Sequence, residues 1–346
     1  MSRMRDIARL AGVSVTTVSH VVNNTRRVAP ATRQRVLDAI AATGYQHNTI
    51  ARALARGGSR SIGLALSALS NPYLADIVAA IERRVKAHGS MVLLGETHEN
   101  AEQEYDLVDT FLVRSVDGVI LAPGPRSLAR TLPALLESGV PTVLIDRLMA
   151  PGAFDQVGSE NRQAVASIVD HLAAHGHQRI ALISGLPGLP TTVERQHGYA
   201  IGLMRSGLPF RRALVADGGS HGVTAARAMS KLWSLSPRPT AVIAANNFMT
   251  VGVLKYLAAQ RIDVPGDIAV AGYDDFEWAE LMSTPITAVA QDWATIGADA
   301  VEMLFARIAD PDREPRSHRI PAKLIVRRSC GCPARTADAD VASRAS

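Results

Sequence analysis

Residues 6–23, with the sequence DIARLAGVSVTTVSHVVN, decide the fold of the N-terminal part of the chain. Apolar residues at helical spacing predict a first helix over residues 4–11, which Gly12 ends. Ser14 suits the N-cap of a second helix over residues 15–23, because its hydroxyl can accept a free backbone N–H of the first turn. A helix, a glycine turn and a short capped helix have the spacing of a helix-turn-helix unit.

The second helix is expected to have one apolar and one polar face. Val18 and Val22 lie four residues apart on one face, whereas Thr16, His20 and Asn23 lie on the opposite face. A three-helix bundle without a ligand would also need the apolar face. The polar face favours contact with another molecule.

A third helix is predicted from Pro30, a residue that suits the first turn, to near Gly44. Val36, Leu37 and Ile40 give it an apolar stripe.

Positive charge is concentrated at the N-terminus. The first 60 residues contain ten arginines, no lysine and two acids, which gives +8 in a chain whose total charge is +5. The other residues therefore sum to −3. A dense basic segment on a mildly acidic body is typical of nucleic-acid binding, although a solvated basic surface would have the same composition.

The composition excludes several other classes of protein. A chain of 346 residues with 47% hydrophobic and 20% charged residues is an ordinary globular protein of two or three folded units. No apolar run is long enough to cross a membrane, and the N-terminus does not read as a secretory signal. Cys330 and Cys332 are too few to complete a zinc site and too close to span a useful disulfide loop. We therefore expect a cytoplasmic protein with no cofactor and no bound metal.

From residue 61 onward, apolar strands alternate with helical stretches, which predicts βαβ units and mostly parallel sheets. Two successive sets of four strands indicate two similar subdomains. The expected strands are residues 62–66, 91–94, 118–121, 142–145, 180–184, 214–216, 241–244 and 268–271.

Polar residues follow several of these strands, where open α/β sheets bind their ligands. Each residue taken singly is a reasonable helix cap or turn residue. As a set they favour a polyhydroxylated ligand, because carboxylates, amides and arginine form paired hydrogen bonds to vicinal hydroxyls. The set comprises Asn71, Tyr73, Asp146, Arg147, Asn246, Asn247, Asp274 and Asp275.

The N-terminal sequence resembles the lactose-repressor (LacI/GalR) family of bacterial transcription regulators. The match runs through residues 6–14, 17–19, 21–23 and 32–33, then Val36, Gly44-Tyr45, Asn48 and Ala51-Arg52-x-Leu54. The resemblance implies that Val15, Thr16 and His20 face base edges and that Ser14, Thr17, Ser19, Asn23 and Thr32 hold phosphates. It also implies a hinge helix over residues 48–56 that carries Asn48 and Ala51 and inserts Leu54 into the minor groove.

We call the basic N-terminal segment with the three expected helices, residues 1–46, the head. This sequence departs from the family pattern at two positions of the head. His20 stands where the family usually has arginine, and Ala29 stands where serine often caps the third helix.

The resemblance extends to about Cys332 and implies a periplasmic-binding-protein-like core of two Rossmann-like subdomains, which the chain crosses near residues 158, 288 and 321. The implied domains are a helix-turn-helix domain (1–46), a hinge and linker (47–60), the core (61–332) and a disordered tail (333–346). The N-subdomain comprises about 61–157 and 289–320, and the C-subdomain about 158–287 and 322–330. The implied effector contacts are Asn71, Tyr73, Asp146, Arg147, Arg195, Asn246, Asp274, Gln291 and Trp293.

We therefore predict a non-enzymatic repressor that binds operator DNA as a homodimer and responds to a small molecule, most simply a sugar or sugar derivative. Two alternatives remain open. A solute-binding protein of a transporter would share the core but would not explain the basic head. A hydrolase could use Ser220 of the G-x-S-x-G sequence at residues 218–222, with Asp274 and His318, but no oxyanion segment accompanies it.

Overall fold

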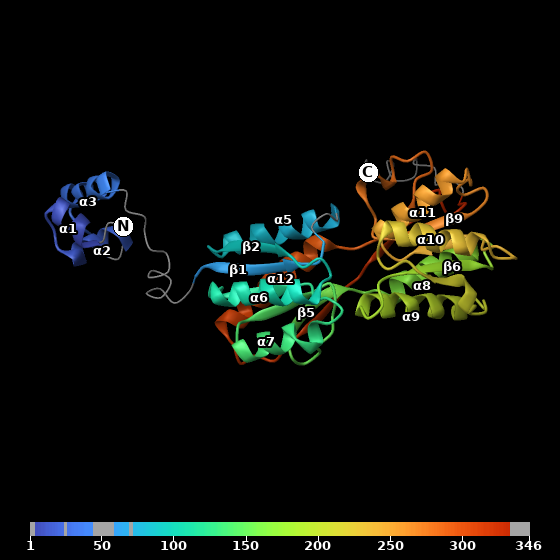
Figure 1. Ribbon diagram of the computed structural model, residues 1–346, viewed down its shortest axis with the longest axis horizontal. Helices are drawn as coiled ribbons and strands as arrows, with labels where there is room; N and C mark the ends of the chain where they lie inside the picture. Colours follow the sequence, from blue (N-terminus) through green and yellow to red (C-terminus); the bar gives the residue numbers. More distant parts are fainter. Residues whose placement is uncertain (1–3, 24–25, 44–58, 69–71, 333–346) are drawn as a thin grey trace, which may run out of the picture. The chain divides into compact units, whose positions relative to one another are not determined.

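The computed structural model describes residues 4–23, 26–43, 59–68 and 72–332, without the side chains of residues 22, 23 and 72–74 (Figure 1). The chain divides into an N-terminal unit, residues 1–59, and a larger unit, residues 60–346. The expected hinge helix with Asn48, Ala51 and Leu54, the candidate Asn71 and the tail 333–346 lie outside the described residues.

The N-terminal unit contains the three expected helices, α1 (Met4–Ala11), α2 (Val15–Asn23) and α3 (Pro30–Thr43). Gly12 takes a φ of +64° and turns the chain between α1 and α2, a conformation that glycine adopts without strain. The Ser14 hydroxyl accepts a hydrogen bond from the Thr17 N–H at 3.1 Å, so the predicted N-cap is confirmed.

The core of this unit contains fewer residues than the apolar pattern of the sequence predicted. Ile7, Val18 and Val36 are fully buried, one from each helix. Leu37, expected in the apolar stripe of α3, is 43% exposed, and Leu10 of α1 is 64% exposed. Each short helix buries only the residues that face its two neighbours, so an adjacent leucine on its flank stays at the surface.

The first sheet of the larger unit is wholly parallel, with the order β11-β5-β4-β3-β1-β2. Helices α5 (Pro72–Ala87) and α12 (Trp293–Ala309) cover one face of the sheet, and α6 (Ala101–Val113) and α7 (Thr131–Ser138) cover the other. The apolar strands β1, β3 and β4 suit this arrangement because they are buried on both faces. The strands are β1 (Ser61–Leu66), β2 (Met91–Glu96), β3 (Gly118–Leu121), β4 (Thr142–Ile145), β5 (Asp155–Ser159) and β11 (Ser317–Ile320).

The second sheet has the corresponding order β12-β10-β9-β8-β6-β7, with β12 antiparallel to β10. Helices α8 (Arg162–Ala174) and α9 (Pro190–Arg205) pack together, as do α10 (Gly222–Trp233) and α11 (Asn247–Ala259). The strands are β6 (Ile180–Ser184), β7 (Val215–Asp217), β8 (Ala241–Ala244), β9 (Ala269–Tyr273), β10 (Thr287–Ala290) and β12 (Lys323–Ile325).

Each of the eight expected strands overlaps a strand of the structure, but the apolar pattern missed β5, β10, β11 and β12. These strands flank the crossings between the subdomains at residues 160–161, 291–292 and 321–322. Strands β11 and β12, with the sequences SHRI and KLI, lie at the edge of each sheet and mix polar with apolar residues. Strand β5 has the largely polar sequence DQVGS although it is buried. Among the described residues, no helix is both long and apolar enough to span a membrane.

Candidate functional site

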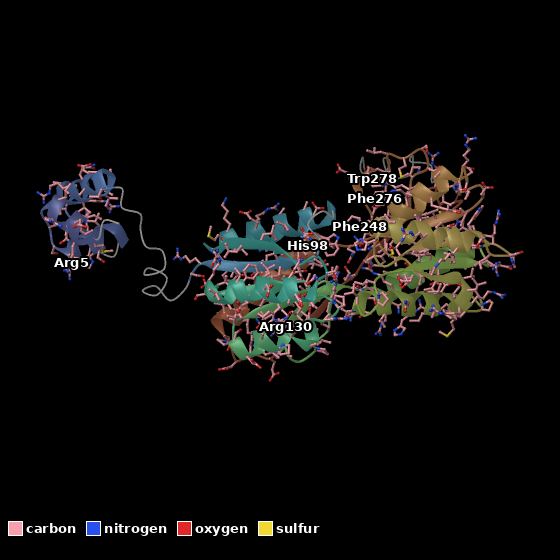
Figure 2. All side chains as sticks on the ribbon, viewed as in Figure 1. Arg5, His98, Arg130, Phe248, Phe276 and Trp278 are labelled. Atoms are coloured by element: carbon pink, nitrogen blue, oxygen red, sulfur yellow. A yellow bond between two sulfur atoms is a disulfide. The ribbon has the colours of Figure 1, made fainter. Side chains whose placement is uncertain are left out.

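A cavity of about 130 Å³ lies within the larger unit, where the carboxyl ends of strands from both sheets converge. The segments that follow β1, β2, β4, β6, β7, β8, β9 and β10 all contribute lining residues. Figure 2 shows His98 and Phe248 on the facing ends of the two subdomains, and Phe248 lines the cavity. Open α/β sheets bind ligands at this edge.

Two aspartates enter the cavity from equivalent positions. Asp146 follows β4 with a φ of +65°, and Asp274 follows β9 with a φ of +70°. This left-handed conformation is uncommon for residues other than glycine, and backbone strain of this kind gathers at functional sites.

Burial raises the pKa of both carboxyl groups, because a desolvated carboxylate is less stable than a desolvated acid. Arg147 opposes the rise in the pKa of Asp146, and Arg195 opposes it for both aspartates. The two carboxyl groups are therefore held in a low-dielectric site where a hydrogen-bond donor or a cation from a ligand would stabilise their charged forms.

Arg147 is fixed in the cavity wall by the first subdomain. Its guanidinium donates two hydrogen bonds to the Glu99 carboxylate, one at 2.8 Å from Nη1 to Oε2 and a shorter one from Nη2 to Oε1. It also donates to the Pro123 carbonyl at 3.0 Å. This paired contact neutralises Arg147 and fixes its orientation.

Arg195 of α9 enters from the second subdomain and has a different environment. Its Nε donates to Asn161 Oδ1 at 2.8 Å, and its Nη1 donates to the Ala245 carbonyl at 2.6 Å. The guanidinium stacks over the Tyr273 ring at 3.6 Å. Burial raises the pKa of Tyr273, so the ring stays a neutral platform. The hydrogen-bond acceptors of Arg195 are uncharged, and the charged groups that its guanidinium faces are the cavity carboxyl groups of Asp146 and Asp274.

Gln291 and Trp293 line the cavity from the crossing between β10 and α12. Gln291 Nε2 donates to Asp274 Oδ1 at 2.5 Å. The other amide atom, Gln291 Oε1, and the indole Nε1 of Trp293 are buried without a hydrogen-bond partner. Buried polar atoms are nearly always paired, so this acceptor and this donor, in two residues that line the cavity, are candidate contacts for a ligand.

The second helix of the N-terminal unit presents the predicted polar surface. Ser14, Val15 and Thr16 are exposed. Thr17, Ser19 and His20 are half-buried, as is Thr32 of α3. The side chain of Asn23 lies outside the described set. Small polar residues on the exposed start of a second helix can approach the major groove of DNA.

Comparisons with known proteins match both parts of the chain. Residues 3–48 match the model of bacterial regulatory proteins of the lacI family, and residues 169–330 match the periplasmic binding protein-like domain. The HTH-type transcriptional repressor PurR of Vibrio parahaemolyticus is 30% identical, over 94% of this chain and 98% of the relative. The chain belongs to the LacI family.

Solved structures of LacI-family regulators have the same fold. A Lac repressor dimer bound to operator and the anti-inducer ONPF is 27% identical with a TM-score of 0.81, over 95% of this chain and 99% of that chain. The complex of the transcriptional regulator CelR with cellobiose is 30% identical with a TM-score of 0.72, over 95% of this chain and all of that chain. The expected helix-turn-helix head and two-subdomain α/β core are therefore confirmed.

The structure of this LacI-family protein brings most of the expected effector contacts into one cavity. Asn247 and Asp275 of the wider set of strand-end residues do not line it: Asn247 Oδ1 accepts from the Phe248 N–H, and Asp275 pairs with Arg327. Asn71 and the side chain of Tyr73 are outside the description. The residues that do line the cavity are Asp146, Arg147, Arg195, Asn246, Asp274, Gln291 and Trp293.

Sequence reasoning missed Glu99, Ser67 and Thr192 among the lining residues. Glu99 follows strand β2, so the search for polar residues after the strands could have identified it. Thr192 lies in the first turn of α9, and nothing in the local pattern marked it.

The structure does not bring the three residues of the hydrolase alternative together. Ser220 Oγ accepts from the Leu186 N–H at 2.9 Å. His318 does not line the cavity with Ser220 and Asp274; its Nδ1 lies 2.7 Å from Asp299 on the first subdomain. The PurR relative reported above is a transcriptional repressor, a class of regulators and not of enzymes.

Proposed function

We propose that this LacI-family protein represses transcription as an operator-bound homodimer, and that a sugar or sugar derivative in the cavity changes its affinity for the operator. The observation that carries the effector proposal is the set of polar groups that line one cavity: the carboxyl groups of Asp146 and Asp274, and the unpaired Trp293 Nε1 and Gln291 Oε1. Operator binding places its action in the cytoplasm.

The cavity chemistry supports a polyhydroxylated ligand. Asp146 and Asp274 accept hydrogen bonds from hydroxyl groups, Arg195 donates them, and Trp293 supplies a flat apolar surface. A complex with cellobiose in the similar regulator CelR supports the same class. The free volume of about 130 Å³ is below the 300–1,000 Å³ of usual ligand sites, so we expect a compact ligand or an opening of the subdomains.

A thermal-shift screen of mono- and disaccharides on the full-length protein tests the effector class. A true ligand at about 100 times its Kd stabilises the folded state by roughly 2.7 kcal/mol through mass action. Asp274→Asn serves as the matched control, because it removes one acceptor without changing the size of the side chain. Equal shifts in both proteins, or none with any sugar, would contradict the proposed effector class.

The positive charge of the head allows operator binding to be tested by its dependence on salt concentration. We expect about 6–10 phosphate contacts per complex and a slope of log affinity against log salt of roughly −5 to −9. A slope near zero would remove the DNA-binding role of the head.

Two substitutions test the roles of the head and of the hinge separately. Leu54→Ala removes the proposed apolar wedge and should weaken operator binding and bending while leaving effector binding unchanged. His20→Arg should shift the selected bases toward guanine, because arginine donates to O6 and N7 together. Identical base preferences in binding-site selection would show that His20 does not read the operator.

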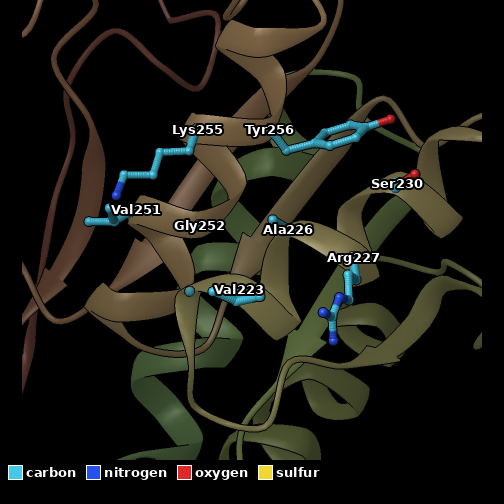
Figure 3. A pocket seen from close by; sticks show the side chains of 9 residues that line it. Val223, Ala226, Arg227, Ser230, Val251, Gly252, Lys255 and Tyr256 are labelled. Carbon is cyan, nitrogen blue, oxygen red and sulfur yellow. The ribbon is translucent and has the colours of Figure 1, made fainter.

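A second hollow, of about 580 Å³, lies between α10 and α11 and supports dimerisation (Figure 3). Its floor is tight, because a Cβ on Gly252 would lie 2.1 Å from the Gly222 carbonyl oxygen. Val223, which is 68% exposed, lines it together with Val251 and Tyr256. An exposed apolar groove of this kind marks an interaction surface, and the similar Lac repressor is a dimer.

A second exposed apolar patch lies at the η3 segment (Glu277–Ala279). Figure 2 shows Phe276 and Trp278 close to each other in the second subdomain, and their ring centroids are 4.0 Å apart. Leu281 nearby in the sequence is 78% exposed. Phe276 belongs to a cluster against which Leu254 of α11 packs. The groove and this segment therefore share α11.

Light scattering during gel filtration tests the dimer face. Val223→Asp and Leu281→Asp should give monomers that bind operator weakly and effector normally. Met204→Asp on α9 is the control, since Met204 is also highly exposed, at 73%. Dimers in both Val223→Asp and Leu281→Asp would contradict this face as the interface.

A further inference from the structure

We propose that His171, His175 and Cys332 form a zinc-binding site in the reduced protein, separate from the effector cavity. One ring nitrogen of each histidine and the Cys332 sulfur all lie within 4.8 Å of one another. Thiolate and imidazole are the ligands that Zn²⁺ prefers in proteins. The number of cysteines alone excluded such a site, because it takes no account of the histidines: His171 lies 161 positions before Cys332 in the sequence.

The two histidines are positioned by α8. His171 lies in its last turn and His175 is its C-cap, so the spacing of four residues places both on one side of the helix. The rings are 4.5 Å apart between centroids. His175 Nδ1 donates a hydrogen bond to the His171 carbonyl at 2.8 Å, which leaves Nε2 with a free lone pair. Metal-binding histidines characteristically donate their other N–H in this way.

Cys332 is brought to this helix by the segment after β12. The Ser329 hydroxyl donates to the Val270 carbonyl at 2.6 Å and accepts from the Thr287 N–H at 2.8 Å. The Cys332 sulfur then lies 3.1 Å from His171 Nε2. Two segments far apart in sequence thus hold a sulfur and a nitrogen at the separation of neighbouring ligands on one ion, given bonds of about 2.0–2.3 Å to zinc.

The cluster is remote from the effector cavity within the second sheet. His177, which precedes β6, contacts Thr240, which precedes β8, with 3.1 Å between Nδ1 and Oγ1. Gly185, which follows β6, lines the effector cavity. The proposed site is therefore at the amino-end edge of the sheet, and the effector is expected at the carboxyl-end edge.

Cys330 and Cys332 are joined by a disulfide in the structure, although they are too close in sequence for the bond to close a useful loop. Gly331, with a φ of +77°, turns the chain so that the two Cα atoms lie 5.4 Å apart. Two electrons and two protons convert this bond to two thiols. A water-soluble phosphine supplies the electrons and leaves as its oxide, with oxygen and the two protons from water.

The Cys332 thiol loses its proton to solvent when it binds Zn²⁺. Cys330 is fully buried and its sulfur lies 3.1 Å from the Arg327 carbonyl, so it is not among the ligands. Solvent fills the fourth position.

The test uses full-length protein, reduced by the phosphine under nitrogen or left as the disulfide. Competition with a chromophoric chelator measures Zn²⁺ affinity, and Co²⁺ is the spectroscopic probe. We expect one Zn²⁺ per reduced chain, sulfur-to-cobalt charge-transfer absorption with Co²⁺, and a higher Tm on adding Zn²⁺. The disulfide form should bind far more weakly, because it has no thiolate.

Variants identify the ligands. Cys332→Ser, His171→Gln and His175→Gln should each weaken Zn²⁺ binding more than about a hundredfold, beyond the effect of losing an outer-shell partner. His197→Gln, which changes an exposed histidine on α9, should have no effect. Cys330→Ser should keep the site and make Zn²⁺ binding insensitive to oxidation, since it cannot form the disulfide.

Three results would overturn the proposal. Reduced wild type that binds Zn²⁺ no better than Cys332→Ser would show surface chelation by histidines only. A Co²⁺ complex without charge-transfer absorption would exclude the thiolate. Loss of Zn²⁺ binding in Cys330→Ser, with an unchanged circular dichroism spectrum, would contradict the ligand set.

Discussion

The two α/β subdomains are built on one plan, yet they contribute different charges to the cavity. The strand orders correspond, so β4 of the first sheet takes the place of β9 in the second. Each of these strands is followed by an aspartate in the left-handed region, Asp146 or Asp274. The scaffold thus places the two carboxyl groups as a pair.

The residue after each aspartate shows where the subdomains differ. Arg147 pairs with Glu99 and lines the cavity. Asp275 pairs with Arg327 through two hydrogen bonds, of 2.6 and 2.8 Å, and is not among the cavity-lining residues. Both pairs fix the loop that carries the aspartate, but the signs are reversed. The second subdomain must therefore supply its cation from a helix, as Arg195.

Removing these two ion pairs one at a time should have the largest effects and should separate their roles. Arg327→Ala and Arg147→Ala each leave a largely buried carboxylate unpaired, which we expect to lower the free energy of unfolding by about 3 kcal/mol. Denaturant titration measures this loss. Only Arg147→Ala should also weaken effector binding in the folded protein. Weakened effector binding in Arg327→Ala would show that its loop is itself part of recognition.

The cation from the second subdomain gives the next largest effect. Arg195→Ala should weaken effector binding by about 2 kcal/mol, roughly 30-fold, through lost charge-assisted bonds, while operator binding persists. Arg195→Lys keeps the charge but not the planar fork and should recover only part of the affinity. Calorimetric titration of the ligand found by the sugar screen measures both. Full affinity in Arg195→Ala would place the ligand against the first subdomain alone.

The sequence predicted the shared plan better than the differences. Strands such as TVLI and AVIA are apolar on both faces, so eight strands and the residues that follow them could be located. The pairing of Arg147 with Glu99 joins residues 48 positions apart, and no local pattern encodes it. Asp275 was expected in the cavity because the sequence does not show which of the residues after a strand point into a binding site. Its ion pair with Arg327 shows that Asp275 has a different role.

The same limit explains the histidine and cysteine cluster. Two cysteines are too few for a zinc site, so we expected no metal. The periodicity of the sequence does not show which helix end lies next to the segment that carries Cys332. Two of the strands at the crossovers, β5 (DQVGS) and β11 (SHRI), were missed because their sequences lack the apolar run by which the other strands were located.

Titration of the paired aspartates gives a smaller effect with a defined sign. Burial raises the pKa of Asp146 and Asp274 in the folded protein above the unfolded value of 3.8. The folded state therefore binds more protons in the window between the unfolded and folded pKa values, and stability falls as pH rises through it. Asp146→Asn and Asp274→Asn should each reduce this fall in Tm, measured over a pH series.

Ligand binding should have the opposite pH dependence. Ligand hydroxyls that donate to the carboxylates favour the ionised forms, so effector affinity should rise with pH in the same window. The double variant Asp146→Asn/Asp274→Asn should bind more weakly, without this rise. A pH dependence that disappears in one single variant alone would show that one subdomain provides the titrating contact, which breaks the pairing.

The smallest effect concerns Trp293, which sits where the chain crosses between the subdomains. Its indole N–H is buried without a partner, so Trp293→Phe removes an unsatisfied donor from the free protein and a ligand contact from the complex. We expect effector affinity to fall by about 1 kcal/mol, or roughly fivefold, with operator binding unchanged. Trp278→Phe, at the exposed η3 segment, is the matched control and should leave effector affinity unchanged. If calorimetry gives the same affinity for Trp293→Phe and wild type, the indole N–H does not meet the ligand, and recognition belongs to the aspartates and arginines of the two subdomains.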